Sequence, residues 1–149
     1  MNSKSKGNIS EAKALFEFQK LGVPVLMPWG DNERYDMVIE LDKKFYRVQV
    51  KTANEQENDS ITCYCRSSTN HTTNKNLSTY ENEVDYFVFY NQIHDKIALV
   101  PFEETNNQKT IRLRLTPTSN GQQKGIRFFD DYLFTKTLCV ETLHGKPKE

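Results

Sequence analysis

The sequence has no long hydrophobic run and little cysteine. No apolar stretch approaches the roughly 18 residues that cross a bilayer, and the opening MNSKSKGNIS contains no apolar signal-peptide core. We therefore expect a cytoplasmic protein with no membrane partner. Cys63, Cys65 and Cys139 are an odd set without a CxxC pair, and the three histidines lack companions at metal-ligand spacing. These patterns argue against a disulfide framework and a zinc site.

Net charge is also lacking, because 20 basic residues balance 20 acidic ones. This balance argues against nucleic-acid binding through bulk electrostatics alone. The charge is nevertheless segregated along the chain: residues 81–107 hold six acids and one base, whereas residues 108–136 hold six bases and two acids. A basic surface therefore remains compatible with the sequence.

With 149 residues, the chain is long enough for one core, so we expect a single domain over residues 1–149. The stretch NISEAKALFEFQKLG has the apolar spacing of an amphipathic helix and ends at Gly22. Asn8 and Glu11 are spaced as a capping box, which predicts that the helix begins there.

Strand patterns dominate after this helix. MVIEL and FYRVQVKTA flank a tight DKK turn and predict a hairpin, and VDYFVFYN, KIALVPF and TIRLRL predict further strands. Residues 66–79 are too polar to build a core, and IRFFDDYLF is predicted as a short helix or strand. The order predicts an α/β fold with one helix before a mixed, mainly antiparallel sheet.

The second hairpin strand carries a pair of polar side chains. Period-2 alternation puts Gln49 and Lys51 on one face, and the turn brings Asp36, at the start of the partner strand, to the same end. Glu11 on the helix would add a second carboxylate. Carboxylates, the Gln49 amide and a strand carbonyl, that of Val50, suit Mg²⁺ or another divalent cation. Ordinary turn chemistry at Asp36, a solvated Lys51 and a capping Glu11 remain alternatives.

In this order, the SE of the helix, the YD before an apolar strand and QVKTA resemble the PD-(D/E)XK nuclease superfamily. They are similar in particular to its small intron-encoded homing endonucleases. The resemblance implies a restriction-endonuclease-like fold, with Asp36, Gln49 and Lys51 in catalytic positions and Glu11 as an auxiliary acid. Gln49 departs from the usual acid, which removes one negative charge from the metal site.

Several basic residues are candidates for holding DNA. TIRLRL puts two arginines on one face, as in a strand that reads the major groove, although a solvated outer face has the same pattern. The polar loop and the N-terminal lysines offer phosphate contacts, with plain flexible segments as the alternative. The candidates are Lys4, Lys6, Arg66, Lys75, Arg112 and Arg114.

Together these features predict a metal-dependent, site-specific double-strand DNA endonuclease of the homing type. A restriction or Holliday-junction-type nuclease of the same fold and a non-catalytic DNA-binding protein are the alternatives. Because one chain has one site, a double-strand break predicts a homo-oligomer, a dimer at least and a dimer of dimers by preference. YFVFY and FFDDYLF are candidate subunit contacts, with core packing as the alternative for each residue.

Overall fold

The computed structural model describes residues 1–67 and 78–139. Helix α1 (Ser3–Lys20) is followed by β1 (Val25–Leu26), β2 (Met37–Leu41), β3 (Lys44–Thr52), β4 (Gln56–Glu57) and β5 (Ser60–Tyr64). Then come β6 (Tyr86–Asn91), β7 (Lys96–Pro101), η1 (Phe102–Thr105), β8 (Thr110–Arg114), η2 (Phe129–Tyr132) and α2 (Phe134–Thr137). Neither helix α1 nor α2 is long and apolar enough to cross a membrane.

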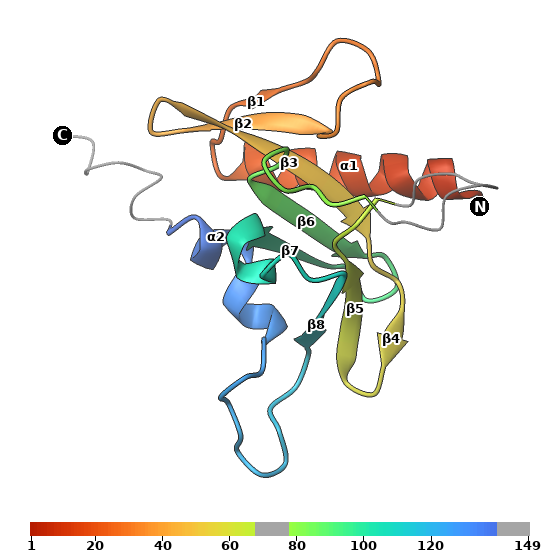
Figure 1. Ribbon diagram of the computed structural model, residues 1–149, viewed down its shortest axis with the longest axis vertical. Helices are drawn as coiled ribbons and strands as arrows, with labels where there is room; N and C mark the ends of the chain where they lie inside the picture. Colours follow the sequence, from red (N-terminus) through yellow and green to blue (C-terminus); the bar gives the residue numbers. More distant parts are fainter. Residues whose placement is uncertain (68–77, 140–149) are drawn as a thin grey trace.

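The strands form two sheets (Figure 1). The larger has the order β1-β2-β3-β6-β7, in which the β3–β6 pair is parallel and the other pairs are antiparallel. The smaller sheet, β4-β5-β8, is antiparallel. The predicted α/β class with a mixed, mainly antiparallel sheet is therefore confirmed. The β4–β5 hairpin was not among the predicted strands, although Ile61 and Cys63 alternate inward as a half-buried strand requires.

Each face of the larger sheet has its own apolar core. On one face, Ala14 and Phe18 of α1 pack against Val48 and Val50 of β3. On the other face, the side chains of β5 and β8 pack with Phe87 and Phe89 of β6. The stretches YFVFY and FFDDYLF supply core side chains, with Phe87, Phe89, Phe129 and Phe134 all buried. Core packing, rather than subunit contact, is the role these phenylalanines have in the chain.

The start of α1 differs from the prediction. The helix begins at Ser3, and the side chain of Asn2 caps it by accepting a 2.8 Å hydrogen bond from the Ser5 N–H. Asn8 and Glu11 therefore lie inside the helix, and the predicted capping box is wrong. The apolar periodicity begins at Ile9, whereas the first turns are polar and exposed, so periodicity alone could not reveal them. The predicted C′ glycine is correct: Gly22 has φ +75°.

The β2–β3 hairpin follows from local sequence. Asp42 and Lys43, at φ 50° and 64°, form its two-residue turn, and such a turn suits the twist of the flanking strands. Met37 then pairs with Val48, which places Asp36 just beyond that pair. The register of the hairpin thus brings Asp36 to the part of β3 that contains Gln49 and Lys51.

Candidate active site

Asp36 is held against β3 by two hydrogen bonds. Its backbone N–H donates to the Val48 carbonyl at 2.9 Å, and its Oδ2 accepts a 2.7 Å hydrogen bond from the Val50 N–H. Burial raises the pKa of Asp36, while the Val50 hydrogen bond and the charge of Lys51 oppose the rise. The carboxylate is thus partly buried and fixed, and its second oxygen, Oδ1, has no partner among the hydrogen bonds of the described residues.

Gln49 and Lys51 lie on the face of the sheet opposite α1. Their in-register neighbours on β6 are Phe87 and Phe89, whose rings belong to the core on that face. Gln49 Nε2 donates to the Val50 carbonyl oxygen at 3.5 Å, so the Gln49 amide group lies beside the carbonyl of the next residue. The predicted alternation is confirmed, since Val48 and Val50 are buried on the other face, beneath α1.

The Lys51 ammonium is partly buried rather than solvated. Nζ donates a 3.1 Å hydrogen bond to the Arg66 carbonyl and lies 5.0 Å from the centre of the Tyr80 ring. Burial lowers the pKa of Lys51, the Asp36 carboxylate opposes this, and the nearby positive charge of Arg34 adds to it. A lysine in this setting can release and accept a proton more readily than a solvated one.

Glu11 approaches the same place from α1. The neighbouring Ser10 is buried and its hydroxyl lies 2.6 Å from the Thr52 hydroxyl at the end of β3, which fixes this turn of the helix over the strand. Burial raises the pKa of Glu11, and the negative charge of Asp36 raises it further. The effect of the Asp36 charge on the pKa of Glu11 indicates that the two carboxylates lie within electrostatic reach of each other.

The donor set fits a hard divalent cation. Carboxylate, amide and carbonyl oxygens are the ligands such ions take. Burial raises the pKa of both carboxyl groups and the Asp36 charge raises that of Glu11 further, so a nearby cation would favour the ionised form of each. Within residues 1–67 and 78–139, no three His, Cys, Asp or Glu side chains form a metal-holding group.

The predicted DNA-binding residues are scattered. Lys4 and Lys6 lie on the exposed first turns of α1, and Lys75 falls outside the described residues. Arg66 is half-buried and donates to the Asn107 carbonyl at 2.6 Å, so its guanidinium is engaged within the chain. In the described part of the chain, no hydrogen bond or ion pair brings Lys4, Lys6 or Arg66 to the Asp36 carboxylate.

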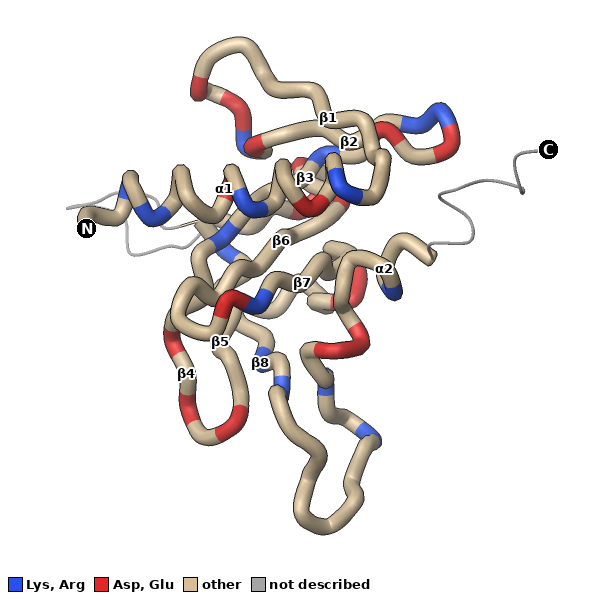
Figure 2. Tube along the Cα trace, turned by 180° about the vertical axis from the view of Figure 1, so that it is seen from behind, with Lys and Arg blue, Asp and Glu red and all other residues tan. Residues whose placement is uncertain are grey.

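Arg112 and Arg114 lie on one face of β8, as predicted, with Ile111 and Leu113 buried on the other. Arg112 pairs with Glu57 at 2.9 Å. Arg114 donates to the Thr116 carbonyl at 2.8 Å and lies 3.8 Å from an Asp59 carboxylate oxygen. Figure 2 shows acidic positions along β4 and the turn that follows it, and basic positions on β8 of the same sheet. The acidic β4–β5 turn therefore neutralises part of the basic face.

Two site neighbours were missed by the sequence analysis, Arg34 and Tyr80. Tyr80 lies between β5 and β6 in the sequence, and the tertiary fold brings its ring to Lys51. Arg34 lies two residues before Asp36, but its partners are 44 and 45 residues away along the chain. No spacing rule links such positions, so no local signal could have found them.

Comparison with known proteins now identifies the family. A family model described as PD-(D/E)XK endonuclease matches residues 1–135. The chain belongs to the PD-(D/E)XK endonuclease family. Enzymes of this family generally use divalent metal ions, in agreement with the donor set around Asp36. A search of curated proteins finds no match.

Two solved structures share the fold of this PD-(D/E)XK chain. The bacterial homing endonuclease I-Ssp6803I superposes with a TM-score of 0.74 at 22% identity, and the match covers 100% of both chains. Hjc of Archaeoglobus fulgidus, a Holliday junction resolvase from an archaeal hyperthermophile, has a TM-score of 0.54 at 13% identity. That match covers 90% of this chain and 96% of Hjc. The expected restriction-endonuclease-like fold is thereby confirmed.

Proposed function

We propose that the protein is a site-specific, metal-dependent double-strand DNA endonuclease of the homing type, with Asp36, Gln49, Lys51 and Glu11 as its active site. The observation that carries the assignment is the 2.7 Å hydrogen bond from the Val50 N–H to Asp36, which fixes the carboxylate to the strand residue that stands between Gln49 and Lys51 in the sequence. The full-length likeness to a homing endonuclease supports the choice within the family.

Each residue of the proposed active site has a role that follows from its functional group. Asp36, with the Gln49 amide, the Val50 carbonyl and Glu11, would hold Mg²⁺ or another divalent cation. When bound, such a cation stabilises charge on the phosphate and makes water a better nucleophile. Lys51, with its lowered pKa, orients the attacking water and takes up or returns its proton at Nζ. It also offsets negative charge that develops on the phosphate oxygens.

Recognition of DNA is assigned to the basic positions on the surface. Arg112 on β8 is exposed and can exchange its ion pair with Glu57 for a base edge or phosphate, because a surface pair of this kind is weak. Lys4, Lys6, Arg66, Lys75 and Arg114 remain proposed contacts. The region between β8 and η2 adds a hydroxyl- and amide-rich stretch, TPTSNGQQKG, suited to base edges and free of acids.

The working enzyme is proposed to be a homo-oligomer. A single active site cuts one strand, so a double-strand break needs two sites related by the two-fold axis of the DNA. A long target favours a dimer of dimers, since competing genomic sites number on the order of 10⁶ or more. Light scattering with and without target DNA measures the number of subunits, and cleavage rates at several protein concentrations give the order of the reaction. A monomer that makes double-strand breaks at first order in protein contradicts the proposal.

A second candidate, a junction-resolving nuclease, is favoured by the likeness to Hjc. The experiment that decides is selection of cleaved molecules from a randomised duplex pool with Mg²⁺, alongside cleavage of a synthetic four-way junction. A homing enzyme enriches one long sequence and leaves the junction no better cut than duplex DNA. Structure-specific cutting without an enriched sequence supports the resolvase, and binding without cutting supports a non-catalytic DNA-binding protein.

A further inference from the structure

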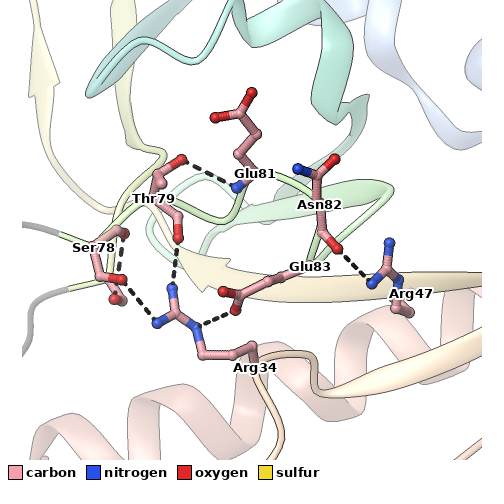
Figure 3. Close-up of polar contacts among 8 residues, drawn as sticks. Arg34, Arg47, Ser78, Thr79, Glu81, Asn82 and Glu83 are labelled. Atoms are coloured by element: carbon pink, nitrogen blue, oxygen red, sulfur yellow. Dashed lines mark hydrogen bonds and ion pairs between the residues drawn. The ribbon is translucent and has the colours of Figure 1, made fainter.

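Arg34 joins the loop before Asp36 to a distant segment, residues 78–83. Its Nη1 donates to the Ser78 hydroxyl and its Nη2 to the Thr79 carbonyl, both at 3.0 Å (Figure 3). Its Nε lies 3.0 Å from a Glu83 carboxylate oxygen. The Nε N–H is not aimed at that oxygen, so this contact is an ion pair rather than a hydrogen bond. Arg34 thereby holds both ends of the segment.

The centre of that segment is Tyr80, which contacts the proposed active site. The Arg34 guanidinium carbon lies 4.5 Å from the centre of the Tyr80 ring, and Lys51 Nζ lies 5.0 Å from it. The ring is 4% exposed and stands edge-on to Phe87, at 5.5 Å between centres. Because Phe87 is the in-register neighbour of Gln49, the ring is fixed to the face that carries Gln49 and Lys51.

Among residues 1–67 and 78–139, the Lys51 ammonium has the Arg66 carbonyl as its hydrogen-bond partner, besides its contact with the Tyr80 ring. A long, flexible lysine side chain can sample several rotamers, and a partly buried cation–π contact with the Tyr80 ring favours those that keep Nζ near the ring. Arg47 also anchors the segment, through the Asn82 carbonyl at 2.8 Å (Figure 3), but no contact joins Arg47 to the Tyr80 ring.

We propose that Arg34 is a positioning residue for the nuclease reaction: it fixes residues 78–83 so that the Tyr80 ring keeps the Lys51 ammonium directed at the site. This inference rests on the proposed function. Arg34 acts through Tyr80 and touches no reacting atom, so its loss affects turnover rather than DNA affinity.

The kinetic test measures single-turnover cleavage at saturating DNA, with DNA affinity measured separately. Arg34→Gln and Tyr80→Leu are expected to slow cleavage at least about 10-fold and to change the DNA Kd less than about 3-fold. Tyr80→Phe, which keeps the ring, stays near the wild-type rate. The double variant R34Q/Y80L is no slower than the slower single variant, because both changes release the same contact. Additive losses, or losses explained by DNA affinity, overturn the proposal.

Arg47→Gln is the matched control. It removes a guanidinium from the far end of the same segment and is expected to cost less than about 3-fold in rate. A loss equal to that of Arg34→Gln would show general anchoring of the segment and would overturn the specific route through Tyr80.

A readout that does not depend on activity separates this inference from the proposed function. The Tyr80 ring current should shift the NMR signal of the Lys51 ε-methylene away from those of other lysines, and Lys51→Met identifies the signal by removing it. Arg34→Gln and Tyr80→Leu should return it to the shift of solvated lysines, whereas Arg47→Gln keeps it. An unshifted wild-type signal, or one unchanged in Arg34→Gln, overturns the inference. A wild-type protein that cleaves no DNA with the shift present overturns the proposed function alone.

Discussion

The Asp36 carboxylate accepts a 2.7 Å hydrogen bond from the backbone N–H of Val50, the residue between Gln49 and Lys51. The backbone of Val50 thus fixes the acid, while its sequence neighbours Gln49 and Lys51 present an amide and an ammonium from the face of the sheet opposite α1. The same residue offers its carbonyl oxygen, 3.5 Å from the Gln49 amide. The chemistry of the site therefore depends on the pairing register of β2 and β3.

Gln49 offers the sharpest test of the ligand set. Gln49→Glu keeps a ligand oxygen and adds a charge, so we expect a retained nuclease with an altered preference among Mg²⁺, Mn²⁺ and Ca²⁺. Gln49→Leu keeps the size and removes the oxygen, and should lose most activity. Cleavage rates at several concentrations of each metal check this. An active Leu variant removes Gln49 from the metal site.

Lys51→Met should abolish DNA cleavage without lowering the free energy of unfolding. Burial lowers the pKa of Lys51 from its ordinary 10.5, so the folded state disfavours the ammonium relative to the unfolded chain. This penalty is present at neutral pH and is lost as the pH rises through the lowered pKa towards 10.5. Met keeps the apolar stem, so the free energy of unfolding at pH 7 should be unchanged or higher while cleavage is abolished. Urea unfolding and cleavage assays measure the two effects.

The paired carboxylates predict a link between metal, pH and stability. Burial raises the pKa values of Asp36 and Glu11 above 3.8 and 4.5, so the folded protein binds more protons than the unfolded chain. Without metal, their contribution to the free energy of unfolding is greatest at low pH and is lost as pH rises through the raised values. Mg²⁺ should restore it at neutral pH.

Thermal unfolding with and without Mg²⁺ measures this link. The wild-type Tm at pH 7 should rise with Mg²⁺, and Asp36→Asn should be at least as stable without metal yet insensitive to Mg²⁺. Glu11→Gln should reduce the Mg²⁺ response without lowering the metal-free Tm, because Glu11 lies inside α1 rather than at its cap. If Glu11→Gln lowers the Tm without any change in cleavage rate, Glu11 has a structural role and does not take part in metal binding.

Arg112 tests the proposed DNA-reading face of β8. Its guanidinium is exposed and paired with Glu57 at 2.9 Å, so Arg112→Gln should leave the free energy of unfolding within about 0.5 kcal/mol. If Arg112 reads a base, the variant loses about 1–3 kcal/mol of affinity and tolerates other bases at one target position. If Arg112→Gln weakens DNA affinity equally for all sequences, Arg112 contacts a phosphate. If DNA affinity is unchanged, Arg112 is not part of the interface. Binding assays on a panel of single-base target variants decide among these outcomes.

The β2–β3 hairpin was predictable because its determinants are local. Alternation along β3 and a two-residue turn place Asp36, Gln49 and Lys51 without knowledge of the rest of the chain. The β4–β5 hairpin was missed because its edge strand, Gln56–Glu57, is two exposed polar residues with no apolar alternation. The position of Glu11 over the site needed the α1–β3 packing, and the link from Arg34 to Tyr80 needed the whole fold.

The most direct measurement is cleavage of a selected target by wild-type protein and by Asp36→Asn and Lys51→Met, with DNA binding measured for all three. The proposed function predicts divalent-metal-dependent cutting by the wild type, a loss of at least about 10²-fold in both variants, and a DNA Kd that changes little. Cleavage by either variant at near the wild-type rate would contradict the assignment of the active site.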